Sequence, residues 1–168
     1  MKDIDYTRLQ QVEVDDVGVS GFYFSNTIKD IMRTMTGLEV FEEKVTGEVL
    51  KEIKQQISGV IVITGPKNIM FSLSMSEYSA KGVVSSMTGI KMEELEWEDL
   101  IDGIAELVNV AAGKIKAKLC TSGDNYICML PYTIYGDNHH IIHKNKKASL
   151  LRMYHNDRLV MLARAYFI

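Results

Sequence analysis

The pattern of apolar residues along the chain predicts three helices. Apolar side chains between Phe22 and Met35 recur with helical spacing and stop before Gly37, a residue type that commonly ends a helix. A short helix is expected from Glu77 to Met87, ending near Gly89. The clearest helix covers about residues 99–119, where one apolar stripe steps by three or four residues and is expected to face the core. That stripe consists of Ile101, Ile104, Val108, Ala111, Ala112, Ile115 and Leu119.

Runs rich in β-branched and aromatic residues predict six strands between and after these helices. Strand-like sequence covers about 38–50, and residues 56–64 and 69–74 are expected to form a hairpin around a Gly-Pro turn. Three strands follow the long helix, at about 125–134, 148–155 and 158–167. Because hairpins dominate this order, the sequence predicts an α+β fold with a largely antiparallel six-stranded sheet and the helices on one face.

A second, polar stripe runs along the long helix. Its members share one side of the helix, away from the apolar stripe, because they are spaced by four, three, four and three residues. They are Asp102, Glu106, Asn109, Gly113 and Lys116. Most Glu and Asn residues on an outer helix face are simply solvated. An Asn in mid-helix is nevertheless a mediocre helix former, and this favours a functional reason for Asn109.

The first helix carries the same residue spacing with some of the residue types changed. When the two helices are aligned on Gly37 and Gly113, the three acidic and amide positions fall on Asn26, Asp30 and Arg33. Each helix is followed by about three strands, which predicts a pseudo-twofold repeat of a helix plus three strands within a single domain. The predicted halves are about residues 21–75 and 98–168, with the short helix between them.

Composition narrows the class of protein. The 168 residues are 46% apolar and 24% charged, which indicates a globular domain and excludes disordered, collagen-like and disulfide-stapled chains. The 19 basic and 22 acidic residues give a net charge of −3, which argues against a general nucleic-acid binder. The sequence contains no run that is apolar enough to span a membrane, and its first residues are polar. Only two cysteines are present, so a cytoplasmic protein with reduced thiols is expected.

The spacing Asp102-x-x-x-Glu106-x-x-Asn109, followed by Pro131, resembles the signature of the CheC/CheX/FliY family of chemotaxis phosphatases. In that family an Asp or Ser, a Glu and an Asn stand at this spacing, and a proline follows about one strand later. Here 21 residues lie between Asn109 and Pro131, one fewer than the family's usual spacing. The resemblance extends from the helix at Phe22 to the final hairpin, and the single intact motif is similar to the CheX-type branch.

The resemblance implies an enzyme that hydrolyses the aspartyl phosphate of a CheY-type response regulator. Asn109 is then expected to hold the attacking water, because a neutral amide can accept from water and donate to a phosphoryl oxygen. Glu106 is expected to act beside it and to pair with a lysine of the regulator, while Asp102 and Gly113 contact the same partner. Gly113 is also expected to let the helix pack closely against the first helix. The resemblance implies no metal or cofactor on this chain, since Mg²⁺ belongs to the regulator.

Other interpretations stay open at this point. A non-catalytic module that binds the regulator or assembles in a flagellar switch would share the same fold, and a small-molecule sensor domain would need an apolar pocket. Three histidines, His139, His140 and His143, could suggest a metal, but they lie among lysines without a completing ligand set, so a solvated loop is expected. Open strand edges favour a homodimer.

Overall fold

The computed structural model describes residues 18–45, 47–120, 123–141 and 150–168, and the helices within them largely follow the predicted positions. The predicted short helix is α3, which spans Glu77–Thr88 and ends at Gly89, and the predicted long helix is α4, which spans Trp97–Leu119. The first helix, α1, spans Gly18–Ile31 and thus begins earlier than expected. It continues as a π-helical turn, η3, over Met32–Thr36. A further helix, α2, covers Gly47–Glu52, where strand had been expected.

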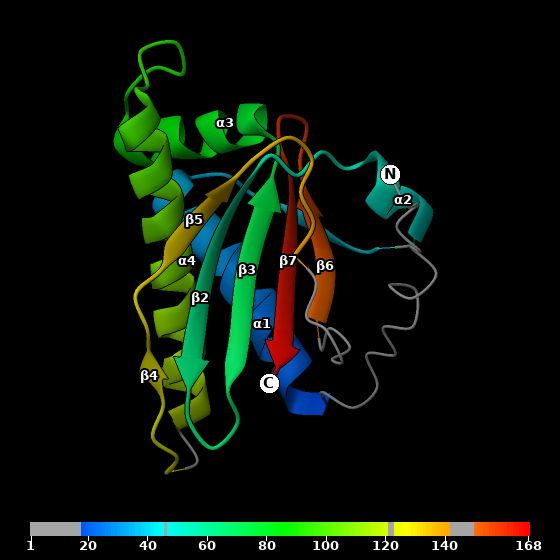
Figure 1. Ribbon diagram of the computed structural model, residues 1–168, viewed down its shortest axis with the longest axis vertical. Coiled ribbons are helices and arrows are strands. Elements are labelled where there is room, and N and C mark those ends of the chain that lie inside the picture. The colour runs from blue at the N-terminus through cyan, green and yellow to red at the C-terminus, as the bar shows by residue number, and fades with distance from the viewer. Residues whose placement is uncertain (1–17, 46, 121–122, 142–149) are drawn as a thin grey trace.

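One seven-stranded antiparallel sheet forms the centre of the molecule (Figure 1). Its strands are β1 (Phe41–Lys44), β2 (Ile57–Thr64), β3 (Ile69–Met75), β4 (Ile127–Cys128), β5 (Tyr132–Tyr135), β6 (Leu150–His155) and β7 (Val160–Phe167). The antiparallel α+β class is confirmed, whereas the count of six is wrong for the part of the chain that is described. The difference arises because the stretch predicted as one strand at 125–134 is interrupted and pairs as β4 and β5.

The strand order interleaves the two halves of the sequence. The order is β1-β6-β7-β3-β2-β4, with β5 also pairing with β2. If β4 and β5 are counted as one interrupted strand, the first half supplies β1, β2 and β3, and the second half supplies the other three. Exchanging the halves then gives the same order read from the opposite edge. This order is compatible with the predicted repeat, and the superposition of the two halves stays a prediction.

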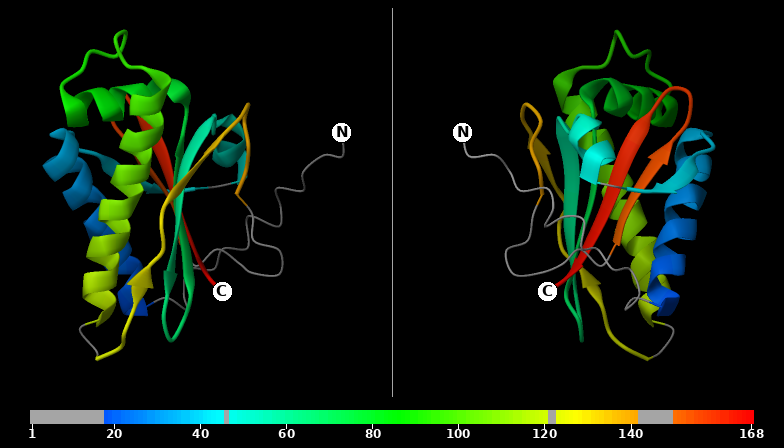
Figure 2. Two further views of the ribbon diagram at one scale, coloured as in Figure 1. Left: turned by 60° about the vertical axis from the view of Figure 1, so that its left-hand side comes forward. Right: turned by 90° about the vertical axis from the view of Figure 1, so that its right-hand side faces the viewer.

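Helices cover both faces of the sheet, contrary to the expectation that they gather on one. Helices α1, α3 and α4 pack on one face, called here the helical face, around a core that includes Phe24, Phe71 and Ile104 (Figure 2). The short helix α2 lies on the opposite face, where its Leu50 and Leu162 of β7 belong to a smaller hydrophobic cluster. The apolar residues of α2 were consistent with a strand in sequence because six helical residues are too few to show a clear helical period.

Two glycines let the long helix lie close to its neighbours. A Cβ on Gly59 of β2 would lie 2.9 Å from the carbonyl oxygen of Ile104, and a Cβ on Gly103 would lie 2.6 Å from a methyl group of Val84 in α3. Real side chains essentially never approach so closely, so these positions require glycine for the observed packing. The apolar stripe of α4 is therefore pressed against the sheet and α3, which fixes the opposite side of α4 toward solvent.

A β-bulge separates β4 from β5. Cys128 pairs with Ile63 of β2 and Tyr132 pairs with Val60, so three residues on this edge strand stand opposite two on β2. Pro131 lies in the bulge, where its missing N–H removes no ladder hydrogen bond. The extra residue shifts the alternation of the strand, so Cys128 and Thr133 both face α4 although they are five positions apart, a spacing that puts residues of a regular strand on opposite faces.

Candidate functional site

The local sequence of α4 stabilises a long, regular helix. Glu96 is the N-cap, and a capping box joins it to Asp99, whose carboxylate accepts from the Glu96 N–H at 3.0 Å. Acidic residues occupy the first turn, and Lys116 and Lys118 lie in the last turn, as the helix dipole favours. At the N-terminal end of α4, Trp97 packs edge-on against Tyr135 of β5, with ring centroids 4.4 Å apart. The middle turns are thus held on a rigid support.

The predicted polar stripe forms an exposed ridge on these middle turns, except for Lys116, which is partly buried. Asp102, Glu106, Asn109 and Gly113 are exposed, while the predicted apolar stripe is buried except for its two partly buried end residues. We call these four residues the polar ridge. Within the described part of the chain, no ion pair or hydrogen bond engages the side chain of Glu106 or Asn109. Their carboxylate and amide are therefore available to a partner.

Gly113 does not let α4 pack against α1, which corrects one expectation. A Cβ added at Gly113 would have no atom within 4 Å, so the residue faces open space. Its neighbour Ala112 is buried, and the close approaches of α4 are made at Gly103 instead. The predicted contact of Gly113 with a partner protein stays a prediction.

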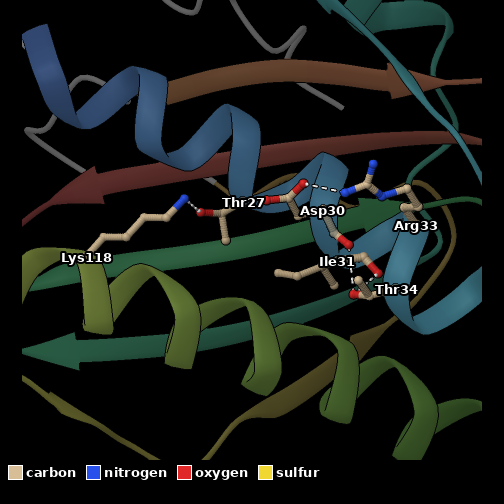
Figure 3. A network of polar contacts seen from close by, with 6 residues as sticks. All are labelled: Thr27, Asp30, Ile31, Arg33, Thr34 and Lys118. Atoms are coloured by element: carbon tan, nitrogen blue, oxygen red, sulfur yellow. Dashed lines mark hydrogen bonds and ion pairs between the residues drawn. The ribbon is translucent and has the colours of Figure 1, made fainter.

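Two of the three equivalent positions of α1, Asp30 and Arg33, pair with each other. Arg33 Nη2 lies 3.4 Å from Asp30 Oδ1, so the copy of the motif is closed by its own ion pair (Figure 3). Helices α1 and α4 run antiparallel, and Lys118 Nζ of α4 donates to Thr27 Oγ1 of α1 at 2.7 Å (Figures 1 and 3). Arg33 also belongs to the π-helical turn, which rotates it relative to an α-helical i+3 position.

A charge cluster further ties α1 to the edge of the sheet. Glu42 of β1 accepts from Ser25 of α1 and forms ion pairs with Lys29 at 3.3 Å and Arg152 at 3.2 Å. The Glu42 side chain is 17% exposed, which makes these pairs less screened than surface pairs. The polar residues of α1 therefore anchor a strand, whereas those of the polar ridge face outward.

The β-bulge lies beside the polar ridge. Thr133 Oγ1 donates to the carbonyl of Ile101 at 3.3 Å, and at the other end of the edge strand Cys128 lies near Lys116. Burial raises the pKa of the Cys128 thiol, and the nearby Lys116 opposes that shift. The bulge between these two contacts accordingly runs along the middle turns of α4. There Leu130 is 88% exposed, and Met129 is also exposed, which adds apolar surface next to the ridge.

The described hollows of the molecule lie away from the polar ridge. A cleft of about 430 Å³ lies between α2 and the strand ends, with Ile53 and Met153 in its lining, and one of about 170 Å³ lies beside α3. The described residues contain no cluster of three or more His, Cys, Asp or Glu side chains suited to a metal ion. No helix among them is long and apolar enough to cross a membrane.

The antiparallel sheet thus supports a helix whose outward ridge holds acidic and amide groups on an open surface. Comparison with protein-family models identifies the family: the model described as "Chemotaxis phosphatase CheX" matches residues 57–153, more than half of the chain. The chain belongs to the CheX family of chemotaxis phosphatases. Dephosphorylation of CheY in chemotaxis, the function predicted from the motif, is thus supported at the level of the family.

Solved structures show the same fold at low sequence identity. The chain is 21% identical to the chemotaxis protein CheX from Vibrio vulnificus, with a TM-score of 0.76 over 89% of this chain and 97% of that one. A complex of CheX with CheY, BeF3 and Mg from Borrelia burgdorferi matches at 21% identity and a TM-score of 0.72, over 86% and 95%. FliY from Thermotoga maritima matches at 14% identity and a TM-score of 0.61, over 99% and 92%. A search of curated protein sequences gave no significant match.

The loop after β5 differs from the solvated loop that was expected. His139 and His140 are half-buried, and hydrogen bonds join His139 Nε2 to Ser58 Oγ at 2.7 Å and His140 Nδ1 to Gln55 Nε2 at 3.0 Å. His143 lies outside the described residues. These contacts were hidden in the sequence because their partners, Gln55 and Ser58, lie just before and at the start of β2, more than 80 residues away. The one available signal was the serine at 58, which stands just before the apolar run Val60–Ile63 of the same strand.

Proposed function

We propose that this protein hydrolyses the aspartyl phosphate of a CheY-type response regulator, with Asn109 holding the attacking water. The observation that carries the proposal is the pairing of Glu106 and Asn109, exposed and unengaged by other described residues, on one side of a capped and tightly packed helix. The family and the CheX–CheY complex from Borrelia burgdorferi support a regulator of this kind as the partner.

The chemistry suits an amide on a rigid support. Phosphoryl transfer has a loose transition state, so catalysis consists mainly of placing the water and stabilising charge. The Asn109 carbonyl oxygen can accept from a water while its NH₂ group donates to a phosphoryl oxygen. An amide adds no negative charge beside the phosphate, and the packing of Ile104 and Val108 under this turn limits the movement of its backbone.

Glu106 serves recognition as well as placement. It lies one helical turn from Asn109, and its carboxylate would repel a phosphate but attract a cation beside it. We infer that it pairs with a lysine of the regulator and thereby fixes the register of Asn109 against the phosphorus. Asp102 and Gly113 extend the contact to either side along the polar ridge. Magnesium enters with the regulator, so no cofactor is proposed for this chain.

The β-bulge supplies the apolar part of the docking surface. Met129 and Leu130 are exposed next to the polar ridge, and an interface commonly combines an apolar patch with charges around it. We infer that these side chains contact the regulator while the ridge enters its active site. A homodimer through an open strand edge and a cytoplasmic location also stay predictions, which light scattering and cell fractionation would check.

Decay of the phosphorylated regulator from the same cell tests the proposal most directly. Regulator labelled with ³²P is mixed with wild-type protein or with Asn109→Ala, and the loss of label is followed. Binding is measured separately with regulator loaded with beryllium fluoride and magnesium. The proposal predicts fast decay with the wild type, decay near the spontaneous rate with Asn109→Ala, and similar binding by both.

The other outcomes separate the alternatives. Binding without accelerated decay would overturn the enzyme and favour a module that binds the regulator or assembles in a flagellar switch, a class for which the fold shared with FliY leaves room. Accelerated decay that survives Asn109→Ala would keep the phosphatase and remove its proposed site. Absence of both binding and decay would exclude that regulator as the partner.

A further inference from the structure

The sheet face opposite α1 and α4 contains a buried arginine for which the described residues supply no acidic partner. Arg164 of β7 is 3% exposed, and its Nη1 donates to Ser74 Oγ at 3.2 Å. Among the residues that the structure describes, no carboxylate lies within ion-pair distance of its guanidinium. Burial lowers the pKa of Arg164 to about 10, so the side chain is still charged at neutral pH. A buried charge is costly when no counter-charge accompanies it.

Two buried serine hydroxyl groups lie beside this arginine. Ser72 of β3 pairs directly with Arg164 across the sheet and is 1% exposed, and its Oγ has no hydrogen-bond partner. Two residues further along β3, Ser74 Oγ accepts from Ser58 Oγ at 2.7 Å. Buried hydroxyls are normally satisfied, so the orphan at Ser72 needs an explanation.

Loop 136–141 closes over this polar cluster. It crosses the front of the sheet in Figure 1, and the carbonyl of Ile141 accepts from Tyr166 Oη of β7 at 3.0 Å. His139 Nε2 joins Ser58 Oγ, which extends the chain of hydrogen bonds from Arg164 to the loop. The pKa of His140 is lowered by burial and by the positive charge of Arg164. The described residues thus place hydroxyl groups and a histidine near Arg164, but no carboxylate within ion-pair distance of it.

We propose that Arg164, Ser72 and loop 136–141 form a binding site for a small oxyanion, either a phosphate or a carboxylate. A guanidinium offers parallel N–H donors that match two oxygens of such a group, and four of its five N–H groups have no acceptor among the described residues. The Ser72 hydroxyl then donates to the same anion. A bound anion explains both the unpaired charge and the orphan hydroxyl.

This site is separate from the polar ridge. Ser72 and Arg164 face away from the core that packs under α4, so the sheet stands between them and Asn109. The inference is therefore independent of the proposed phosphatase activity.

Thermal unfolding of the full chain in different anions tests the site. Inorganic phosphate and acetate are each compared with chloride at equal ionic strength and pH. An anion that binds the folded state raises the midpoint of unfolding in a saturable way. A response to phosphate would identify a phosphate ligand, and a response to acetate a carboxylate, either of which supports the site.

Two variants and a control locate the effect. Ser72→Ala removes the orphan hydroxyl and should weaken anion affinity about ten-fold or more, while its midpoint in chloride is unchanged or higher. Arg164→Met should abolish the response where it folds. Arg158→Met removes an exposed arginine at the β6–β7 turn and should respond like the wild type. In NMR titrations, saturating anion should raise the pKa of His140 in the wild type.

Two results would overturn the proposal. One is a wild-type midpoint that is the same in phosphate, acetate and chloride, which would make Arg164 a purely structural residue. The other is a response that Ser72→Ala retains at full strength, which would place the anion elsewhere. The Ser72 variant keeps the test decisive even if Arg164→Met does not fold.

Discussion

Helices α1 and α4 hold related sequence frames, but they use them in opposite ways. On α4, Glu106 and Asn109 face outward, and no described residue engages them. On α1, Asp30 pairs with Arg33, and the neighbouring residues Thr27 and Lys29 bind α4 and β1. The difference teaches that a candidate site depends on whether its polar side chains lack partners within the chain, as much as on their spacing. One helix serves as scaffold, and this leaves the other free to present a site.

The largest expected effect comes from the amide of α4. Asn109→Ala should reduce the acceleration of regulator dephosphorylation by about 10²–10³-fold, the usual cost of a lost positioned hydrogen-bonding group. Affinity for the beryllium fluoride form should change little, because the interface keeps its other contacts. Asn26→Ala on α1 is the matched control and should retain the wild-type rate. A loss of rate with Asn26→Ala would mean that both helices contribute to the site.

The next effect concerns the charge one turn earlier. Glu106→Ala should weaken binding to the regulator about ten-fold and lower the rate as well, because an interfacial ion pair is lost. Titration of the regulator at two salt concentrations measures this, and the wild type should show the steeper salt dependence. Asp30→Ala, the equivalent on α1, should leave affinity unchanged. Equal affinities for Glu106→Ala and the wild type would contradict the assigned role.

A smaller effect distinguishes the two aligned glycines. Gly37 ends η3, the continuation of α1, at φ 69°, whereas Gly113 lies inside α4 with open space at its Cβ position. Gly37→Ala should therefore lower the free energy of unfolding by about 1 kcal/mol, and Gly113→Ala should raise it by about 0.5–1 kcal/mol. Urea denaturation measures both. If Gly113 contacts the partner, Gly113→Ala should also bind the regulator a few-fold more weakly despite its greater stability.

The smallest effect is expected from restoring the motif on α1. Arg33→Asn recreates the amide, but the position lies in a π-helical turn and does not reproduce the geometry of Glu106 and Asn109. The dephosphorylation rate should stay within about two-fold of the wild type. The lost ion pair is exposed, so stability should fall by less than about 0.5 kcal/mol. A marked gain in rate would show that the second frame is still competent.

The sequence predicted the features that depend on local periodicity. The buried stripe and the polar ridge of α4 follow from 23 residues of regular helix, and the hairpin of β2 and β3 follows from β-branched runs around a Gly-Pro turn. The features that it missed depend on contacts between distant segments. The β-bulge exists only relative to β2, and the burial of His139 depends on a serine 81 residues away. Arg164 gave a signal that was overlooked, since it is the one charged residue in the strand Val160–Phe167.

The interleaved strand order has a consequence for the synthesis of the chain. The strand β7, made last among those described, lies between β6 and β3 near the middle of the sheet. While it is still inside the ribosome, β3 lacks its neighbour on that side, and the edge that β3 presents is one that the finished protein hides. The nascent chain thus exposes this edge until β7 emerges, so a pause by the ribosome that holds β7 inside it should favour capture by chaperones or aggregation.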